Sequence, residues 1–166
     1  WSSSAASDVY KRQEEYISNP RHIEVQIIGD GRGNVRHLYE RECSIQRRYQ
    51  KVIEEAPAQY LTSSQKKAMR DDAEKLASSM KYLNAGTVEF LVPAYDSNTH
   101  YFLEMNTRIQ VEHGITEKIC SIDLIEKQIS VAYTKSFDFE QKDITFKGHA
   151  IQARVCCEAV DDEFRP

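Results

Sequence analysis

The sequence predicts an α+β fold, with a mainly antiparallel sheet and flanking helices, from three kinds of pattern. Residues 22–40 contain two alternating segments joined by a turn rich in glycine, which indicates a β-hairpin. Residues 62–82 place apolar side chains at helical spacing. Residues 86–92 and 100–106 alternate again, and we expect these two strands to pair antiparallel.

The composition is typical of a soluble globular protein. The chain has 166 residues, of which 40% are hydrophobic and 29% charged, enough for one domain with a core. A net charge of -4 argues against a nucleic-acid or anionic-membrane partner, and no apolar run approaches the length of a membrane span. The cysteine spacing indicates reduced structural thiols in a cytosolic compartment and argues against a zinc site or a disulfide framework. These residues are Cys43, Cys120, Cys156 and Cys157.

The amino-terminal part contains a lead, the hairpin and a polar segment. Residues 1–13 are mostly small and polar, and we expect an unstructured lead or a foreign scar, with an ordinary flexible terminus as the alternative. One face of the first hairpin strand is apolar: Ile23, Val25 and Ile27. Residues 41–51 are dense in cations and amides and form either a solvated loop or a segment that contacts phosphate or bicarbonate. Pro57 then ends any regular element.

Two helices are predicted, each with a cap and an apolar stripe. Thr62 or Ser63 can cap the helix over 62–82. The core stripe of this helix is Met69, Ala73, Leu76, Ala77 and Met80. Ser121 caps the second helix, which runs to about Tyr133. The buried stripe of the second helix is Ile122, Ile125, Ile129 and Ala132.

The carboxy-terminal part is predicted to contain one further strand. Residues 137–147 are irregular or a weak strand. Residues 148–158 alternate, with one face made of Ile151, Ala153 and Val155. Arg154 lies on the opposite face and is either a surface residue or a cation of a functional site.

The strands over 86–92 and 100–106 bring three oxygen ligands together. Their inward faces are Val88, Phe90 and Val92 in the first strand, and Tyr101, Leu103 and Met105 in the second. If the strands pair antiparallel, Glu89 lies on the same face as Glu104 and Asn106. Like charges resist such convergence unless a cation lies between them, so the arrangement favours a divalent metal site.

The most informative stretch is residues 104–113, which we interpret as extended. Its polar side chains then share one side of the backbone: Glu104, Asn106, Arg108, Gln110 and Glu112. Spacing alone leaves a functional site and a solvated surface strand equally open. In a site, Arg108 offers a planar fork for a carboxylate, carbonate or phosphate, and Glu112 is a candidate general base.

Several segments resemble biotin carboxylase, the ATP-grasp enzyme or domain of the biotin-dependent carboxylases. The match runs over residues 14–166, and the run over 106–113 is highly specific. The other matching segments are 19–26, 40–48, 50–52, 54–57, 85–91 and 148–150. The resemblance implies an ATP-grasp fold truncated at both ends, with part of the ATP-grasp domain over 14–147 and the start of a C-terminal domain over 148–166.

The resemblance also implies a reaction, its cofactors and its partners. ATP, with Mg²⁺ or Mn²⁺, phosphorylates bicarbonate to carboxyphosphate, which releases CO₂, and biotin on a carrier domain is then carboxylated at N1. The implied partners are a biotin carboxyl carrier domain and a carboxyltransferase, and the full enzyme is implied to be a homo-oligomer. We expect a cytoplasmic location, or a mitochondrial one for a eukaryotic parent.

The resemblance assigns roles to residues by their position in the motifs. The implied metal ligands are Glu89, Glu104 and Asn106, and the implied catalytic residues are Lys51, Arg108, Glu112 and Arg154. Bicarbonate is assigned to Lys51, Arg108, Gln110 and Val111. The nucleotide is assigned to Glu14, Tyr16, Ile17, His22, Gln46, Tyr49 and Leu91. In this scheme Glu112 takes the proton of bicarbonate and Arg154 stabilises the biotin enolate.

The chain departs from the family pattern in several places. Tyr49 replaces the usual His near the nucleotide, which puts ATP affinity in doubt, although Tyr keeps a ring and a hydrogen-bonding tip. Gly114 replaces the common Pro, and the turn around residues 95–98 is longer than in short bacterial enzymes. The first half of the ATP-grasp, with its lid and phosphate-binding lysines, is absent, so we expect the isolated chain to be inactive or very weak.

Two other functions stay open. One is another ATP-grasp ligase, such as a carbamoyl-phosphate synthetase or a purine-pathway carboxylase relative, which shares carboxylate and Asn metal ligands but lacks the runs over 46–51 and 108–113. The other is a non-catalytic remnant that only binds a partner. Among carboxylases, we expect an acyl-CoA carboxylase parent, because residues 105–107 are more similar to that type than to pyruvate carboxylase.

Overall fold

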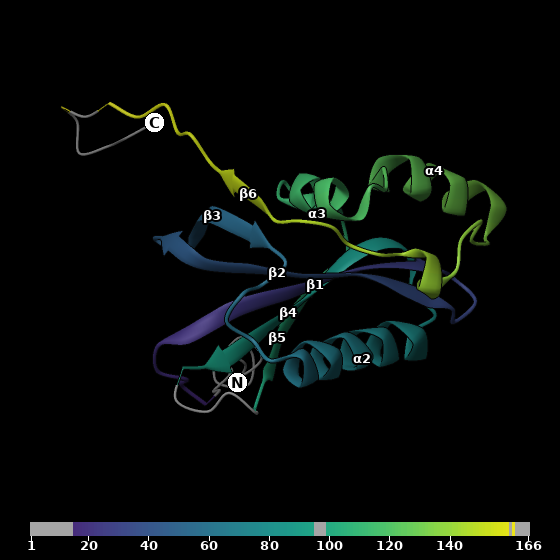
Figure 1. The fold of residues 1–166 in the computed structure, drawn as a ribbon, viewed down its shortest axis with the longest axis horizontal. Helices are drawn as coiled ribbons and strands as arrows, with labels where there is room; N and C mark the ends of the chain where they lie inside the picture. The colour runs from purple at the N-terminus through teal and green to yellow at the C-terminus, as the bar shows by residue number, and fades with distance from the viewer. Residues whose placement is uncertain (1–14, 95–98, 160, 162–166) are drawn as a thin grey trace, which may run out of the picture.

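The computed structural model describes residues 15–94, 99–159 and 161, and within them the chain forms a six-stranded antiparallel sheet with helices on both faces (Figure 1). The strand order is β5-β4-β1-β2-β3-β6. The strands are β1 (Pro20–Asp30), β2 (Val35–Arg47), β3 (Gln50–Ala56), β4 (Leu83–Pro93), β5 (Tyr101–Asn106) and β6 (Ala150–Ala153). The helices are α2 (Ser63–Ser79), α3 (His113–Cys120) and α4 (Leu124–Thr134), with a 3₁₀ turn, η1, at Gln141–Asp143. The predicted α+β fold with a mainly antiparallel sheet is confirmed.

The predicted hairpin lies at the centre of this sheet. β1 pairs with β2 on one side and with β4 on the other, so both of its edges are hydrogen-bonded. The carboxylate of Asp30 accepts from the backbone N–H groups of Arg32 at 2.7 Å and Asn34 at 3.1 Å, which closes the turn. Gly33 adopts a φ of 103°, a conformation that glycine tolerates best.

The first core lies between the sheet and α2. It contains the predicted apolar faces of β1 and β4 and most of the predicted helix stripe: Ile23, Val25, Ile27, Val88, Phe90, Val92, Met69, Ala73 and Ala77. Thr62 caps α2 as predicted, in a reciprocal pair with Gln65 that forms a capping box. Met80 was wrongly placed in the stripe. It follows the last helical residue and is 52% exposed.

The second core lies on the opposite face, under α3 and α4 (Figure 1). It includes Ile28, Leu38, Ala56, Ile115, Ile119, Leu124 and Val131. The second predicted helix is present as α4 and ends at Thr134, close to the expected Tyr133. Its predicted cap is wrong, because Ser121 ends the separate helix α3 in a left-handed conformation and Asp123 caps α4. This break changes which residues face the sheet, so the predicted stripe residues Ile125 and Ile129 are 41% and 67% exposed.

The polar segment over 41–51 is a strand pair and not a solvated loop. β2 continues to Arg47 and β3 begins at Gln50, so only Arg48 and Tyr49 lie between them. Both turn residues have a positive φ, of 52° and 63°. The loop interpretation failed because several of the polar side chains here are partners inside the fold, and burial with partners is compatible with a strand.

Two outer strands differ from their predicted apolar faces. In β5 a bulge opposite Glu89 and Phe90 shifts the register, and Tyr101 is 37% exposed. β6 is shorter than predicted and lies at the sheet edge, where Ile151 is 64% exposed. β3 ends at Ala56, before Pro57, as predicted. The predicted lead over residues 1–13 lies outside the described residues.

The extended interpretation of residues 104–113 holds only for its first part. β5 ends at Asn106, and α3 begins at His113. Residues 107–112 therefore form a connection that lets its polar side chains turn toward one cavity without a strand alternation. None of the helices in the described part of the chain combines the length and apolarity needed to cross a lipid bilayer.

Candidate active site

A cavity of about 430 Å³ opens where β1 to β5 and the connection before α3 meet. The cavity brings together twelve of the predicted site residues: His22, Gln46, Tyr49, Lys51, Glu89, Glu104, Asn106, Arg108, Gln110, Val111, Glu112 and Arg154. Gln50 and Leu103 also line it and were not predicted. Tyr16, Ile17 and Leu91 are not in its lining, and Glu14 lies outside the described residues. The cavity therefore unites the predicted metal, bicarbonate and catalytic residues, whereas three of the six predicted nucleotide residues that the structure describes lie outside its lining.

Lys51 is the cation at the centre of the cavity floor. Its ammonium group donates to three carboxylates, at 2.5 Å to Glu24, 2.7 Å to Glu89 and 2.8 Å to Glu112. The Lys51 side chain is 12% exposed. Burial disfavours its charge, but the negative charge of Glu24 and the hydrogen bonds outweigh this and raise the pKa of Lys51. Lys51 therefore stays protonated.

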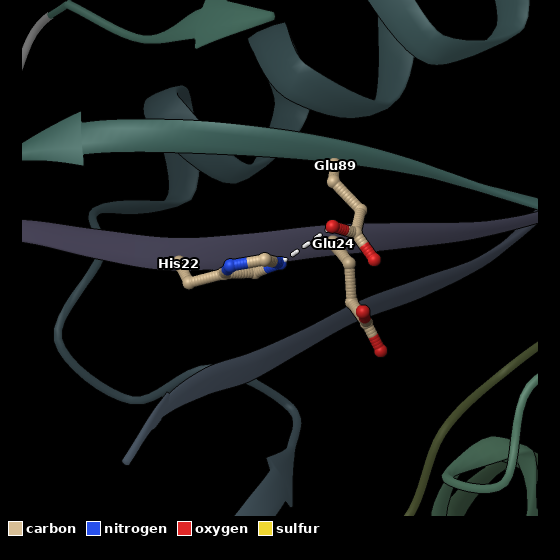
Figure 2. Close-up of side chains that lie close together, drawn as sticks. All are labelled: His22, Glu24 and Glu89. Carbon is tan, nitrogen blue, oxygen red and sulfur yellow. Dashed lines mark ion pairs between the residues drawn. The ribbon is translucent and has the colours of Figure 1, made fainter. Parts of the chain in front are cut away.

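Glu89 connects Lys51 to His22. Figure 2 shows the imidazole of His22 directed at Glu89, with Nε2 2.9 Å from Oε2, and Glu24 next to them. Burial opposes the charge of Glu89, yet its contacts with His22 and Lys51 lower its pKa to about 2. His22, Glu24 and Glu89 have ligand atoms close enough to hold a metal ion. The ammonium group of Lys51 contacts both carboxylates and the guanidinium group of Arg41 pairs with Glu24, so side-chain cations already offset the charge of this cluster.

Glu112 joins Lys51 to Arg154. Its side chain is 2% exposed, and its Oε2 accepts from Nη2 of Arg154 at 3.0 Å. Burial raises the pKa of Glu112, but the hydrogen bond and charge of Lys51 outweigh it, and the pKa is lowered. Glu112 is therefore an ionised carboxylate beside the cavity, able to accept a proton.

The predicted metal ligands converge as expected. Glu89 and Glu104 lie opposite each other on β4 and β5. Nδ2 of the Asn106 amide donates to Oε1 of Glu89 at 3.0 Å and to Oε1 of Glu104 at 3.2 Å, and its Oδ1 accepts from Arg108. Glu104 is exposed to the cavity, and no cation pairs with it within residues 15–94, 99–159 and 161. Two carboxylates and an amide at one cavity wall are a donor set that fits Mg²⁺.

The predicted bicarbonate residues differ in their exposure and in their hydrogen bonds to other side chains. Arg108 is exposed, and among the described residues its guanidinium donates only to the backbone oxygen of Ile109 and the amide oxygen of Asn106, at 3.2 and 3.3 Å. Gln110 is buried and donates to Glu89 at 3.0 Å. Val111 is 66% exposed at the cavity edge. Arg108 is therefore the side chain of this set most available to an anion.

A buried polar network beneath the cavity was missed by the sequence analysis. Arg41 is wholly buried, and its guanidinium contacts five side chains: Glu24, Gln26, Thr87, Gln110 and Thr116. Glu24 and Gln26 alternate with the core residues of β1, and this was the available signal. Because α3 was not predicted, the face that carries these residues was not recognised as covered.

Comparison with known proteins gives three findings. A family model described as carbamoyl-phosphate synthase L chain, ATP binding domain, matches residues 2–139. Biotin carboxylase 2, chloroplastic, of Populus trichocarpa is 52% identical over 153 residues, which cover 92% of this chain and 29% of that protein. A pyruvate carboxylase component of Methanothermobacter thermautotrophicus is 52% identical over 153 residues, which cover 92% of this chain and 30% of that protein.

A solved structure is similar in three dimensions. It is the biotin carboxylase domain dimer of 2-oxoglutarate carboxylase from Hydrogenobacter thermophilus, in complex with MgADP, ADP and bicarbonate. Its TM-score is 0.85 at 45% identity, and the match covers 92% of this chain and 33% of that one. The chain thus spans about three tenths of the length of the curated relatives.

Proposed function

The chain belongs to the carbamoyl-phosphate synthase L chain ATP-binding family, among its biotin carboxylase members, and we propose that the whole protein is an ATP-dependent ligase that carboxylates biotin. The proposed reaction uses ATP and bicarbonate, passes through carboxyphosphate and ends on biotin carried by a separate domain. Relatives of similar identity are named for different carboxylases, so the expectation of an acyl-CoA carboxylase parent stays a prediction.

Bicarbonate activation is the step that the cavity supports best. We assign bicarbonate to the space between Arg108 and Lys51, whose positive charges attract the anion. Glu112 accepts the proton of bicarbonate, and an oxygen of the resulting carbonate attacks the γ-phosphorus of ATP. The bond between the γ-phosphorus and the bridging oxygen breaks, and ADP leaves with the electron pair of that bond. The observation that carries this assignment is the ionised, buried carboxylate of Glu112 between Lys51 and Arg154.

Carboxylation of biotin follows at the same cavity. Carboxyphosphate separates into CO₂ and phosphate, the phosphate takes the N1 proton of biotin, and N1 then attacks CO₂. The biotin enolate carries negative charge on its oxygen, and we assign its stabilisation to Arg154. Mg²⁺, when bound by Glu89, Glu104 and Asn106, would neutralise the phosphate charge of ATP.

The nucleotide assignment is partial. His22, Gln46 and Tyr49 line the cavity and are our candidates for contacts with ATP. Tyr49 is 100% exposed at the β2–β3 turn, so its ring is available to a ligand. The proposed partners of the whole protein are a biotin carboxyl carrier domain and a carboxyltransferase, and we propose a homo-oligomer because the solved relative is named as a dimer. A compartment that keeps thiols reduced is proposed because Cys43, Cys120, Cys156 and Cys157 are free.

The test is ATP cleavage by the whole protein with Mg²⁺, with and without bicarbonate, and with and without free biotin. We expect cleavage to depend on bicarbonate and to rise with biotin. Glu112→Gln should lose most of this activity because the proton acceptor is gone, typically about a hundredfold or more. Glu117→Gln is the matched control and should retain activity. Glu112 directly precedes α3, whereas Glu117 lies within α3 and outside the cavity lining.

Two results, one from this assay and one from a calorimetric titration, would contradict the proposal. A rate of ATP cleavage that is the same with and without biotin would favour another ATP-grasp ligase. No binding of Mg-ATP in a calorimetric titration would favour a partner-binding remnant. The expectation that the 166-residue chain alone turns over slowly stays a prediction, and the same assay on the chain tests it.

A further inference from the structure

Glu54 is a wholly buried carboxylate that the proposed reaction does not use. It lies on β3, and its exposed fraction is 0%. Oε1 accepts from Nε of Arg154 at 2.7 Å, whereas Oε2 has no hydrogen-bond partner in the described part of the chain. Burial raises the pKa of its carboxyl group. A buried carboxylate with an unpaired oxygen costs stability, which points to a role beyond packing.

Two of the three guanidinium nitrogens of Arg154 donate to carboxylates. Its backbone N–H donates to the carbonyl of Val52 at 2.9 Å, which fixes the start of the side chain. Nε contacts Glu54, and Nη2 contacts Glu112 at 3.0 Å. Nη1 has no partner within residues 15–94, 99–159 and 161. The side chain is 21% exposed and lines the cavity, so an amino group is available to a ligand there.

The guanidinium group of Arg154 is paired with two carboxylates, Glu54 on one side and Glu112 on the other. Without Glu54, Glu112 would be the one carboxylate partner left to Arg154 among the described residues, and the guanidinium would be drawn toward it. Arg154 would then leave its place at the cavity wall. A displacement of a charged group by about 1 Å can reduce catalysis on the order of a hundredfold.

We propose that Glu54 is a positioning residue, which holds Arg154 beside Glu112 with one amino group directed to the oxygen of the biotin enolate. This inference rests on the proposed function and extends it to a residue that does not itself touch substrate. The carboxylate of Glu54 acts through Arg154. A defect at Glu54 is therefore expected in the carboxylation of biotin more than in bicarbonate-dependent ATP cleavage.

A purely structural role for Glu54 makes a different prediction. Arg154 follows β6, so its ion pair with Glu54 also ties β6 to β3. Glu55 makes a similar contact, because its Oε2 lies 3.4 Å from Nε2 of His149, the residue before β6. Glu55→Gln is therefore a matched control: the same substitution on the next residue of β3, outside the cavity lining. If only these contacts between β3 and the β6 segment mattered, Glu54→Gln and Glu55→Gln would reduce activity to the same extent.

The experiment measures two rates on the whole protein: bicarbonate-dependent ATP cleavage without biotin, and carboxylation of free biotin. For Glu54→Gln we expect kcat/KM for biotin carboxylation to fall at least about tenfold, with ATP cleavage reduced clearly less. Glu55→Gln should change neither rate by more than about threefold, the range of a surface substitution. Glu54→Asp, which keeps the charge at a shorter reach, should fall between wild type and Glu54→Gln.

A double-mutant cycle with Arg154→Gln decides whether Glu54 acts through Arg154. We expect Glu54→Gln to add little loss of biotin carboxylation once Arg154 is replaced. Additive losses, or equal losses in both rates, would overturn the positioning role even if Glu54→Gln is less stable. If the wild-type protein shows no bicarbonate-dependent ATP cleavage, the proposed function itself fails, and that result is separate from the cycle.

Discussion

Nζ of Lys51 donates to Oε1 of Glu112 at 2.8 Å, so the central cation of the cavity is paired with the proposed proton acceptor. The same ammonium group holds Glu24 and Glu89. One ammonium group thus contacts three buried carboxylates, and Arg41 and Arg154 supply further positive charge to Glu24 and Glu112. Changes to Lys51 will therefore affect both stability and activity.

Replacement of Lys51 by Met should be strongly destabilising. It leaves the partner carboxylates buried without their shared cation, and loss of one partner of a buried ion pair costs about 3–5 kcal/mol. Urea unfolding of the protein measures this change in the free energy of unfolding. Lys67→Met removes an exposed pair with Asp71 on α2 and should cost less than about 1 kcal/mol. Equal costs for the two variants would contradict the account.

Glu89 should make the stability depend on pH in the acidic range. Its pKa is about 2 in the folded protein, against an ordinary 4.5, so its ionised form stabilises the protein above pH 4.5. This contribution is lost as the pH falls from about 5 to 2. The stability gap between wild type and Glu89→Gln should therefore shrink by about 2 kcal/mol between pH 7 and pH 3. Urea unfolding at both values measures it.

Glu126→Gln is the control for this pH dependence. Glu126 lies on α4, and its side chain is 70% exposed. The Glu126→Gln curve should run parallel to that of the wild type between pH 7 and pH 3. A Glu89→Gln curve that also runs parallel would show that Glu89 does not carry the effect.

Replacement of Arg41 by Met should destabilise the protein by about 3–5 kcal/mol, because it leaves Glu24 buried beside fewer cations. The double variant Arg41→Met/Glu24→Gln should recover part of this loss, since the uncompensated charge is removed as well. Thermal unfolding of the single and double variants provides the comparison. A double variant less stable than Arg41→Met alone would argue against charge compensation by Arg41.

Removal of an oxygen donor at β5 should weaken the response to Mg²⁺. Asn106→Leu is close in size and has no ligand atom, and we expect the Mg²⁺ concentration for half-maximal ATP cleavage to rise about tenfold. Asp71→Asn, an acidic residue on the exposed surface of α2, should leave the Mg²⁺ response unchanged. An unchanged response in Asn106→Leu would remove Asn106 from the metal site.

The fold was largely predictable where periodicity was strong. The hairpin, the helix capped by Thr62 and the β4–β5 pair follow from patterns in which one face is apolar and the other polar. α3 was missed because its eight residues are too few to show a clear period. The course of residues 107–112 was also missed, since a polar alternation fits a strand and a turn equally well.

The gathering of the candidate residues at one cavity was predictable, and their hydrogen bonds and ion pairs were less so. The cavity unites Glu89, Glu104 and Asn106 with Arg108 and Glu112, as the motifs suggested. The sequence did not reveal that Lys51 bridges carboxylates from three different segments, because long-range ion pairs leave no local pattern. The buried partners Arg41 and Glu54 were missed for the same reason.

The most direct test of the central claim follows the oxygen atoms of bicarbonate. The whole protein is supplied with ATP, Mg²⁺, biotin and ¹⁸O-labelled bicarbonate, and the released phosphate is analysed by mass spectrometry. If an oxygen of bicarbonate attacks the γ-phosphorus, breakdown of carboxyphosphate leaves that oxygen on phosphate, and we expect ¹⁸O-labelled phosphate in step with ATP cleavage. Phosphate that carries oxygen from water alone would contradict the account.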